Sequence, residues 1–221
     1  MKINELLAVL IVLAVMLVAF EEAFGQNPVP ELEPVLTGLE QRYDMPGFTA
    51  AFVQHSKMAA MEVEDRASGK VHIKRPGKMR WEYQLPERQV MVSDGVQLWI
   101  YRPDDRQVMI GRAPDYFGDG KGASFLSDMR VLRRNFTISL QTDGDAEHYR
   151  LRLVPNRRTA DLAAIFLDVR KNDFTIDTVT TINAYEDETR IEFSGLTADA
   201  TLSESLFSFD MPPGTEILKL E

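Results

Sequence analysis

The 221-residue sequence contains no cysteine. This excludes disulfides, thiolate metal ligands, a cysteine nucleophile and an N-terminal lipidated cysteine. Histidine is scarce as well: His55, His72 and His148 lie far apart, and no two of them have the spacing of metal ligands. We therefore expect surface histidines and no metal site.

The common sequence motifs of enzymes are also missing. There is no G-x-S-x-G, no H-E-x-x-H, no phosphate-binding P-loop and no dinucleotide fingerprint. Gly118, Gly120 and Gly122 have the spacing of a flexible loop, but no phosphate-binding Lys or Ser/Thr accompanies them. The adjacent Asp187 and Glu188 fall in a predicted turn, where solvated carboxylates are the simpler interpretation. The sequence thus predicts a protein that is not an enzyme, with no catalytic residue and no cofactor.

A basic surface is absent too, because acidic side chains outnumber basic ones and the net charge is −9. Phosphate contacts require Lys and Arg, so nucleic acid is excluded as a partner. Anionic lipid surfaces are poor partners for the same reason.

The N-terminus carries the longest apolar run, the 15 residues Leu6–Phe20. Membrane spans need about 20 such residues. Ala23-Phe24-Gly25 then places small residues where signal peptidase cleaves, before Gln26. We predict a signal peptide at 1–25 and one domain at 26–221; an uncleaved anchor is the alternative. Cleavage leaves 24 basic and 31 acidic side chains, a net charge of −7.

Strand patterns dominate the rest of the chain. The cleanest alternates Met79, Trp81 and Tyr83 with polar neighbours, which is typical of a strand with one buried face. The predicted strands are 48–54, 69–74, 79–85, 89–92, 96–101, 107–110, 136–141, 149–154, 165–169, 176–184 and 190–193, with a last short apolar piece at 206–209. Helices are expected at about 33–43 and 123–134. A Gly-rich loop at 112–122 directly precedes the second helix.

About ten or eleven antiparallel strands in one series have to curl. We therefore predict a mainly β fold with a helical lid (α+β): a single incomplete, strongly curved antiparallel barrel. Its apolar face needs a cover, which the N-terminal helix and the segment 112–134 can supply.

Aromatic and methionine side chains are concentrated in the middle of the chain. Methionine is adaptable and suits surfaces that receive flexible apolar ligands, although such residues on strands are equally typical of an ordinary core. If they line a ligand cavity, we predict that its wall consists of Met79, Trp81, Tyr83, Leu98, Ile100, Phe125, Leu126 and Met129.

One stretch resembles a known family. The residues are Arg75-Pro76-Gly77-Lys78-Met79-Arg80-Trp81-Glu82-Tyr83, Pro86, Val92-Ser93-Asp94-Gly95, Leu98-Trp99-Ile100-Tyr101 and Gln107-Val108, with Phe48–Gln54 before them and Phe207–Gly214 near the end. This pattern, covering about 35–217, is similar to the outer-membrane lipoprotein carrier protein family, LolA.

The resemblance implies a half-barrel with a helical lid and a periplasmic chaperone without catalytic activity. Such a carrier would take lipid-modified (acylated) proteins from an inner-membrane ABC transporter to an outer-membrane acceptor, and it would act as a monomer. The resemblance also implies that Arg75 holds the lid shut through hydrogen bonds to the backbone of 112–134. An exposed arginine before a turn is the plainer interpretation. Met79 stands where the family commonly has an aromatic residue.

Two other functions fit a similar fold. An exported sensor of lipids or lipoproteins would signal through a protein partner, and we would expect it to carry a second domain after residue 221. A lipocalin-type binder of small molecules would require a closed barrel without the 112–134 insertion.

Overall fold

A computed structural model describes residues 31–61, 63–117 and 121–220. The predicted signal peptide lies outside these residues. The strands are β1 (Gly47–Met58), β2 (Val63–Lys74), β3 (Lys78–Leu85), β4 (Gln89–Ser93), β5 (Gln97–Arg102), β6 (Gln107–Arg112), β7 (Phe136–Gln141), β8 (His148–Pro155), β9 (Ala164–Arg170), β10 (Ile176–Ile182), β11 (Glu188–Ala198) and β12 (Glu216–Lys219). The helices are α2 (Leu32–Arg42), α3 (Ala113–Phe117), α4 (Arg130–Asn135) and the 3₁₀ helices η1 (Lys121–Ser127) and η2 (Glu204–Phe207).

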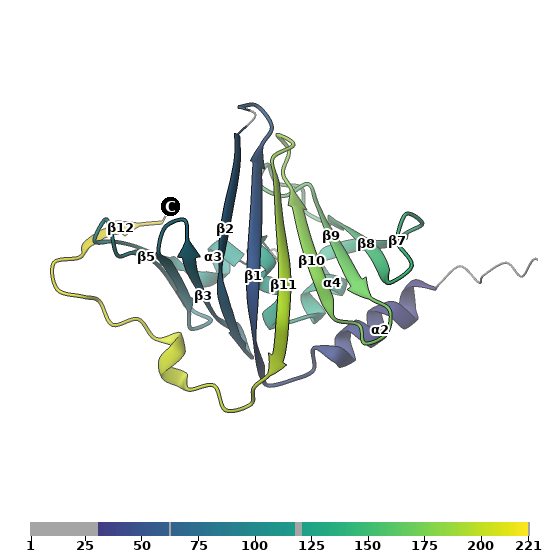
Figure 1. Cartoon of the computed structure of the whole chain (residues 1–221), viewed down its shortest axis with the longest axis horizontal. Helices are drawn as coiled ribbons and strands as arrows, with labels where there is room; N and C mark the ends of the chain where they lie inside the picture. Colours follow the sequence, from purple (N-terminus) through teal and green to yellow (C-terminus); the bar gives the residue numbers. More distant parts are fainter. Residues whose placement is uncertain (1–30, 62, 118–120, 221) are drawn as a thin grey trace, which may run out of the picture. The chain divides into compact units, whose positions relative to one another are not determined.

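The twelve strands found in the described residues form one sheet, in the order β12-β6-β5-β4-β3-β2-β1-β11-β10-β9-β8-β7. It consists of two meanders, β1–β6 and β7–β11, in which each strand pairs with the next one along the chain. The antiparallel pair β1–β11 joins the meanders, with Phe48 opposite Ala198. β12 and β7 are the two edges of the sheet and do not pair with each other, so the sheet is open. Figure 1 shows that it is also curled. The predicted fold class is confirmed.

The concave face of the sheet holds the main core. Along β3, Met79 and Trp81 are buried while Arg80 and Glu82 are not, as the alternation predicts. α2 packs on this face through Val35, Leu36, Leu39 and Tyr43, and Tyr43 Oη accepts a hydrogen bond from the Ile176 amide at 3.0 Å. α3, η1 and α4 belong to the lid segment (residues 112–134 and the end of α4), whose apolar side chains join the same core.

The convex face carries a separate, smaller core under the C-terminal strap, residues 199–215. Val92 and Val108 are fully buried there, and the ring of Phe209 lies against Trp99 and Tyr101. Glu204 pairs with both Lys74 and Lys78 and fastens the strap to β2 and β3. Figure 1 shows the strap running from the lower end of β11 round the β5 side of the sheet to β12.

Several local predictions were wrong. The single helix expected at 123–134 is divided into η1 and α4, since the Ser124 and Ser127 hydroxyls donate to the carbonyls of Phe117 and Ser124, and such bonds compete with a regular helix. Ala123 has a φ of 60°, which an α-helix does not accommodate.

At the C-terminus, 204–207 is a 3₁₀ turn, and a strand absent from the prediction follows it. This strand, β12, pairs with β6 in parallel, the one parallel pair among the described strands. The sheet therefore has one strand more than the upper predicted count.

Candidate functional site: a lid-covered apolar cavity

A cavity of about 300 Å³ lies on the concave face, between the first meander, β11 and the lid. Its lining is mostly apolar, with a few polar side chains. The lining residues are Gln54, Trp81, Tyr83, Gln89, Met91, Ile100, Arg102, Met109, Tyr116, Phe117, Thr189 and Ile191. A site of this kind can bind an apolar ligand and hold a polar group at its margin.

The structure brings three of the eight predicted wall residues, Trp81, Tyr83 and Ile100, to the cavity lining. The other predicted residues on strands, Met79 and Leu98, are buried in the adjoining core. In the lid, Phe125 and Leu126 are buried in that core as well. Met129 also belongs to this core and lines a second cavity of about 440 Å³. That these residues contact a ligand stays a prediction.

Sequence reasoning missed much of the lining, including Met91, Met109, Tyr116 and Ile191. The first two could have been found from the register, because cross-strand partners share a face. Trp81 is opposite Met91, Met91 is opposite Ile100, and Ile100 is opposite Met109. One inward-facing row across β3–β6 therefore forms most of the wall.

Aromatic contacts stiffen the β1–β3 side of the wall. Phe52 meets Trp81 and Tyr83 edge to face, each at 5.0 Å between ring centroids. Such pairs contribute about 0.5–1.5 kcal/mol beyond the area they bury. Burial raises the pKa of Tyr83 to about 12, so its hydroxyl keeps its proton and donates to Gln54 Oε1 at 3.0 Å.

The opposite wall is more adaptable, because β4 and β6 contribute the flexible side chains of Met91 and Met109, whereas β3 contributes rigid rings. Arg102 lies at the margin and donates to Gln89 Oε1 at 3.3 Å. The cavity thus combines a fixed side with a side that can change shape.

The lid is joined to α2 by ion pairs. Arg133 of α4 donates to Glu33 at 2.8 Å and to Glu40 at 2.5 Å. These side chains lie at the surface, where each such pair contributes about 0.2–1 kcal/mol. The polar contacts therefore orient α4 against α2, while the buried lid side chains supply most of the attraction to the sheet.

Arg75 lies where α2, the β2–β3 turn and α4 meet. Its guanidinium donates to Asp44 Oδ1 at 3.3 Å, and it faces the second cavity together with Met129 and Arg130. With the described lid residues it makes no hydrogen bond to backbone; its contact is to Asp44, two residues after the end of α2, instead. The latch role remains a prediction, and Asp44 is its partner in this conformation.

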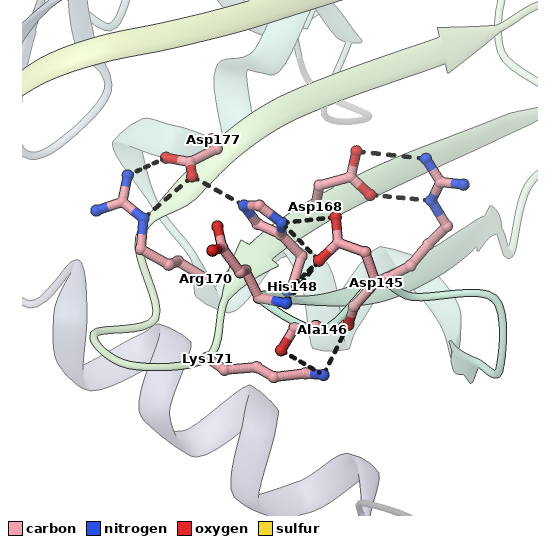
Figure 2. A network of polar contacts seen from close by, with 9 residues as sticks. Asp145, Ala146, His148, Asp168, Arg170, Lys171 and Asp177 are labelled. Atoms are coloured by element: carbon pink, nitrogen blue, oxygen red, sulfur yellow. Dashed lines mark hydrogen bonds and ion pairs between the residues drawn. The ribbon is translucent and has the colours of Figure 1, made fainter.

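A polar network joins the ends of β8, β9 and β10 (Figure 2). His148 lies between two carboxylates, with its Nδ1 at 2.9 Å from Asp145 and its Nε2 at 3.0 Å from Asp177. Asp177, then Asp145, raise the pKa of His148. Arg170 also pairs with Asp177, and Lys171 donates to the Asp145 carbonyl.

Asp168 and Asp177 pair with arginines and Asp145 pairs with His148, so the network ties the strands together. The reading of His148 as a plain surface residue was wrong: its side chain is only 21% exposed.

Within residues 31–61, 63–117 and 121–220, no three His, Cys, Asp or Glu side chains are grouped to hold a metal ion. In that same part of the chain, no helix has the length and apolarity to cross a membrane.

Residues 44–210 match the sequence model of a protein family, "Outer membrane lipoprotein carrier protein LolA". Among curated proteins, the chain is 29% identical over 172 residues to an outer-membrane lipoprotein carrier protein of Nitrosomonas europaea, covering 78% of this chain and 82% of that one. It is also 29% identical over 175 residues to the carrier protein of Neisseria gonorrhoeae, covering 79% and 82%.

Among solved structures, an uncharacterized conserved protein from Thermus thermophilus aligns with a TM-score of 0.55 at 12% identity, over 85% of this chain and 98% of that one. At that identity the likeness concerns the fold alone.

Proposed function

The chain belongs to the LolA family, and from this premise we propose that it is a periplasmic carrier that shields the acyl chains of lipoproteins and shuttles them from the inner to the outer membrane. The observation that carries the proposal is the apolar cavity under a lid, within the part of the chain that matches the family. The proposed action is binding and release, without catalysis.

Shielding is the energetic task of such a carrier. Each methylene group of an acyl chain costs about 0.8 kcal/mol when water surrounds it, so several long chains make the cargo insoluble. The wall formed by Trp81, Met91, Ile100 and Met109 offers an apolar surface in place of water. A cavity of about 300 Å³ is at the small end of the range for single drug-sized ligands, roughly 300–1,000 Å³. Cargo with several chains therefore has to displace the lid.

The lid makes release possible without a nucleotide. Phe117 of the lid lines the cavity, and Phe125 is fully buried in the core beside it. Cargo and lid thus compete for the same apolar surface, and closure of the lid recovers burial that departing cargo gives up. In this proposal Asp44 links Arg75 to the lid, because its carboxylate also attracts Arg130 of α4, and this link biases the lid toward closure.

The remaining features of the proposal rest on the N-terminal sequence and on the resemblance to carrier proteins. Residues 1–25 would be a signal peptide removed before Gln26, and 26–221 one carrier domain that works as a monomer. An inner-membrane ABC transporter would load the cargo, and an outer-membrane acceptor would receive it.

The proposal is tested by purifying the exported protein after incubation with spheroplasts that release lipoproteins. N-terminal sequencing should begin at or within a few residues of Gln26, and mass spectrometry should find acylated peptides with the protein. A retained Met1 would contradict the signal peptide. A signalling protein in place of acylated cargo would favour the alternative, an exported lipid- or lipoprotein-sensing regulator.

A further inference from the structure

Three neutral polar side chains lie on the concave face next to the cavity. Gln54 and Ser56 follow the buried Phe52 at two-residue intervals along β1, so they share its face. Thr189 of β11 is directly opposite Ser56. Gln54 and Thr189 both line the cavity, beside the apolar Trp81 and Ile191. A group of hydrogen-bonding side chains therefore borders a mostly apolar site.

The hydrogen bonds of Gln54 fix the direction of its amide. Tyr83 Oη donates to Gln54 Oε1 at 3.0 Å, and Gln54 Nε2 donates to Ser56 Oγ at 3.0 Å. A primary amide has two N–H donors, so one remains. The Ser56 hydroxyl accepts from Gln54 and keeps its own proton to donate. The Thr189 hydroxyl makes no side-chain hydrogen bond to the described residues, so it is a third donor.

These three donors restrict which ligands can fill the cavity. Water satisfies them while the margin is open. A pure hydrocarbon that covered them would leave each polar group without a hydrogen-bond partner, which opposes binding. A ligand that places acceptors at this depth avoids the cost. The ligand must therefore be apolar at one end and rich in acceptors where it passes Gln54, Ser56 and Thr189.

The charges nearby select neutral acceptors. Asp65 of β2 is opposite Ser56 and shares its face, so a carboxylate lies beside the donors. An anionic phosphate or carboxylate would be repelled there. Arg102, the cation at the cavity margin, lies across the cavity on β5, where it is bonded to Gln89. Ester and amide carbonyls are the neutral acceptors that join fatty acyl chains to a lipoprotein head group.

We propose that Gln54, Ser56 and Thr189 form a binding site for the carbonyl oxygens of the cargo's ester- and amide-linked acyl chains. The inference rests on the proposed carrier function and adds a selectivity to it. The hydrocarbon tails enter the cavity, the carbonyls stop at the β1–β11 margin, and the peptide remains outside. The site thereby sets the depth of insertion and distinguishes acyl from alkyl chains.

The test compares two synthetic lipopeptides that differ only in their linkage. One carries two palmitoyl esters on a glyceryl-cysteine, and the other carries two hexadecyl ethers, which lack the carbonyls. Their affinities for the purified exported protein are measured by displacement of bis-ANS. The ester should bind about fivefold more tightly for each hydrogen bond formed, since such a bond contributes about 1 kcal/mol.

Variants of the three donor residues test whether these side chains cause the preference for the ester lipopeptide. Thr189→Val and Ser56→Ala should each lower the ester-to-ether affinity ratio by about fivefold and leave ether affinity unchanged or higher. Gln54→Met should lower the ratio further. Gln84→Met removes an exposed glutamine from the other face of β3 and should leave the ratio as in wild type. Circular dichroism and thermal melts verify that each variant is folded.

A wild-type protein that binds both lipopeptides equally would overturn the inference, as would variants that keep the full ratio. Either result leaves the carrier function intact, because the lipids still bind. Failure to bind either lipopeptide would instead refute the carrier function and the inference with it.

Discussion

Competition between lid and cargo can be tested at Phe125. This side chain is fully buried in the core that the lid shares with the concave face, and its helix η1 packs on β2 and β3. Phe125→Ala removes the ring and weakens the closed state. If cargo has to displace the lid, the variant should bind apolar ligands more tightly than wild type.

The magnitude follows from the burial of the ring. Burying a Phe side chain contributes about 1.5–3 kcal/mol, and the closed state of the lid loses this contribution in Phe125→Ala. Apparent affinity for a two-chain lipopeptide should then rise about 10- to 100-fold, and the gain stops once the open state dominates. Global stability should fall by about 3–5 kcal/mol, the usual cost of Phe→Ala in a core.

Phe207 offers a matched control. It is only 2% exposed, yet it lies in the strap, in the separate core of the convex face. Phe207→Ala should cost a similar amount of stability while affinity stays at the wild-type value. The difference between the two variants separates release of the lid from general loosening of the fold.

The assay is titration with bis-ANS and lipopeptide, alongside urea unfolding monitored by tryptophan fluorescence. If Phe125→Ala binds no more tightly than Phe207→Ala at equal loss of stability, lid and cargo do not compete, and the release mechanism is wrong.

Three further predictions concern charged groups. Arg75→Leu should keep the fold and cargo uptake but slow hand-over up to about fivefold in a two-step transfer assay, because an exposed pair such as Arg75–Asp44 contributes about 0.2–1 kcal/mol; unchanged hand-over would leave Arg75 an ordinary turn residue. His148 has a raised pKa, so its contribution to stability is complete below about pH 6.5 and is lost as pH rises through its pKa in the folded state. The urea midpoints of wild type and His148→Gln should therefore converge at high pH. A difference between the two midpoints that stays constant with pH would contradict this. Lys74 and Lys78 lower the pKa of Glu204 to about 2, so its contribution is present above the unfolded-state value of about 4.5 and is lost toward pH 2; acid titrations of wild type and Glu204→Gln should differ near neutral pH and meet near pH 2.

The strand series was predictable because apolar side chains alternate wherever one face of a strand is buried, as at Met79, Trp81 and Tyr83. β2 was found only from Gly69 onward. Its first half, from Val63, is mostly exposed and polar, and it is held in the sheet by its pairing with β1. β12 was missed for a related reason, since its four residues are all exposed and its parallel pairing with β6 depends on the path of the strap.

The cavity was predictable in outline and not in detail. Trp81, Tyr83 and Ile100 could be placed on its wall from alternation along their own strands. Ile191 and Thr189 come from β11, and only the long-range pairing of β11 with β1 brings them beside Gln54. Likewise, nothing local in the sequence brings Asp44 to Arg75.

The division of the sheet into two meanders has a consequence for the order in which the chain folds. Within each meander every pairing is between neighbours in sequence, so β1–β6 can assemble before the second half of the chain arrives. The seam β1–β11 joins residues as far apart as Phe48 and Ala198, so it has to wait for nearly the whole chain. Closing so long a loop is slow, and until then the free edge of β1 is open to pairing with other chains. The protein is therefore most vulnerable to aggregation in the interval before this seam closes.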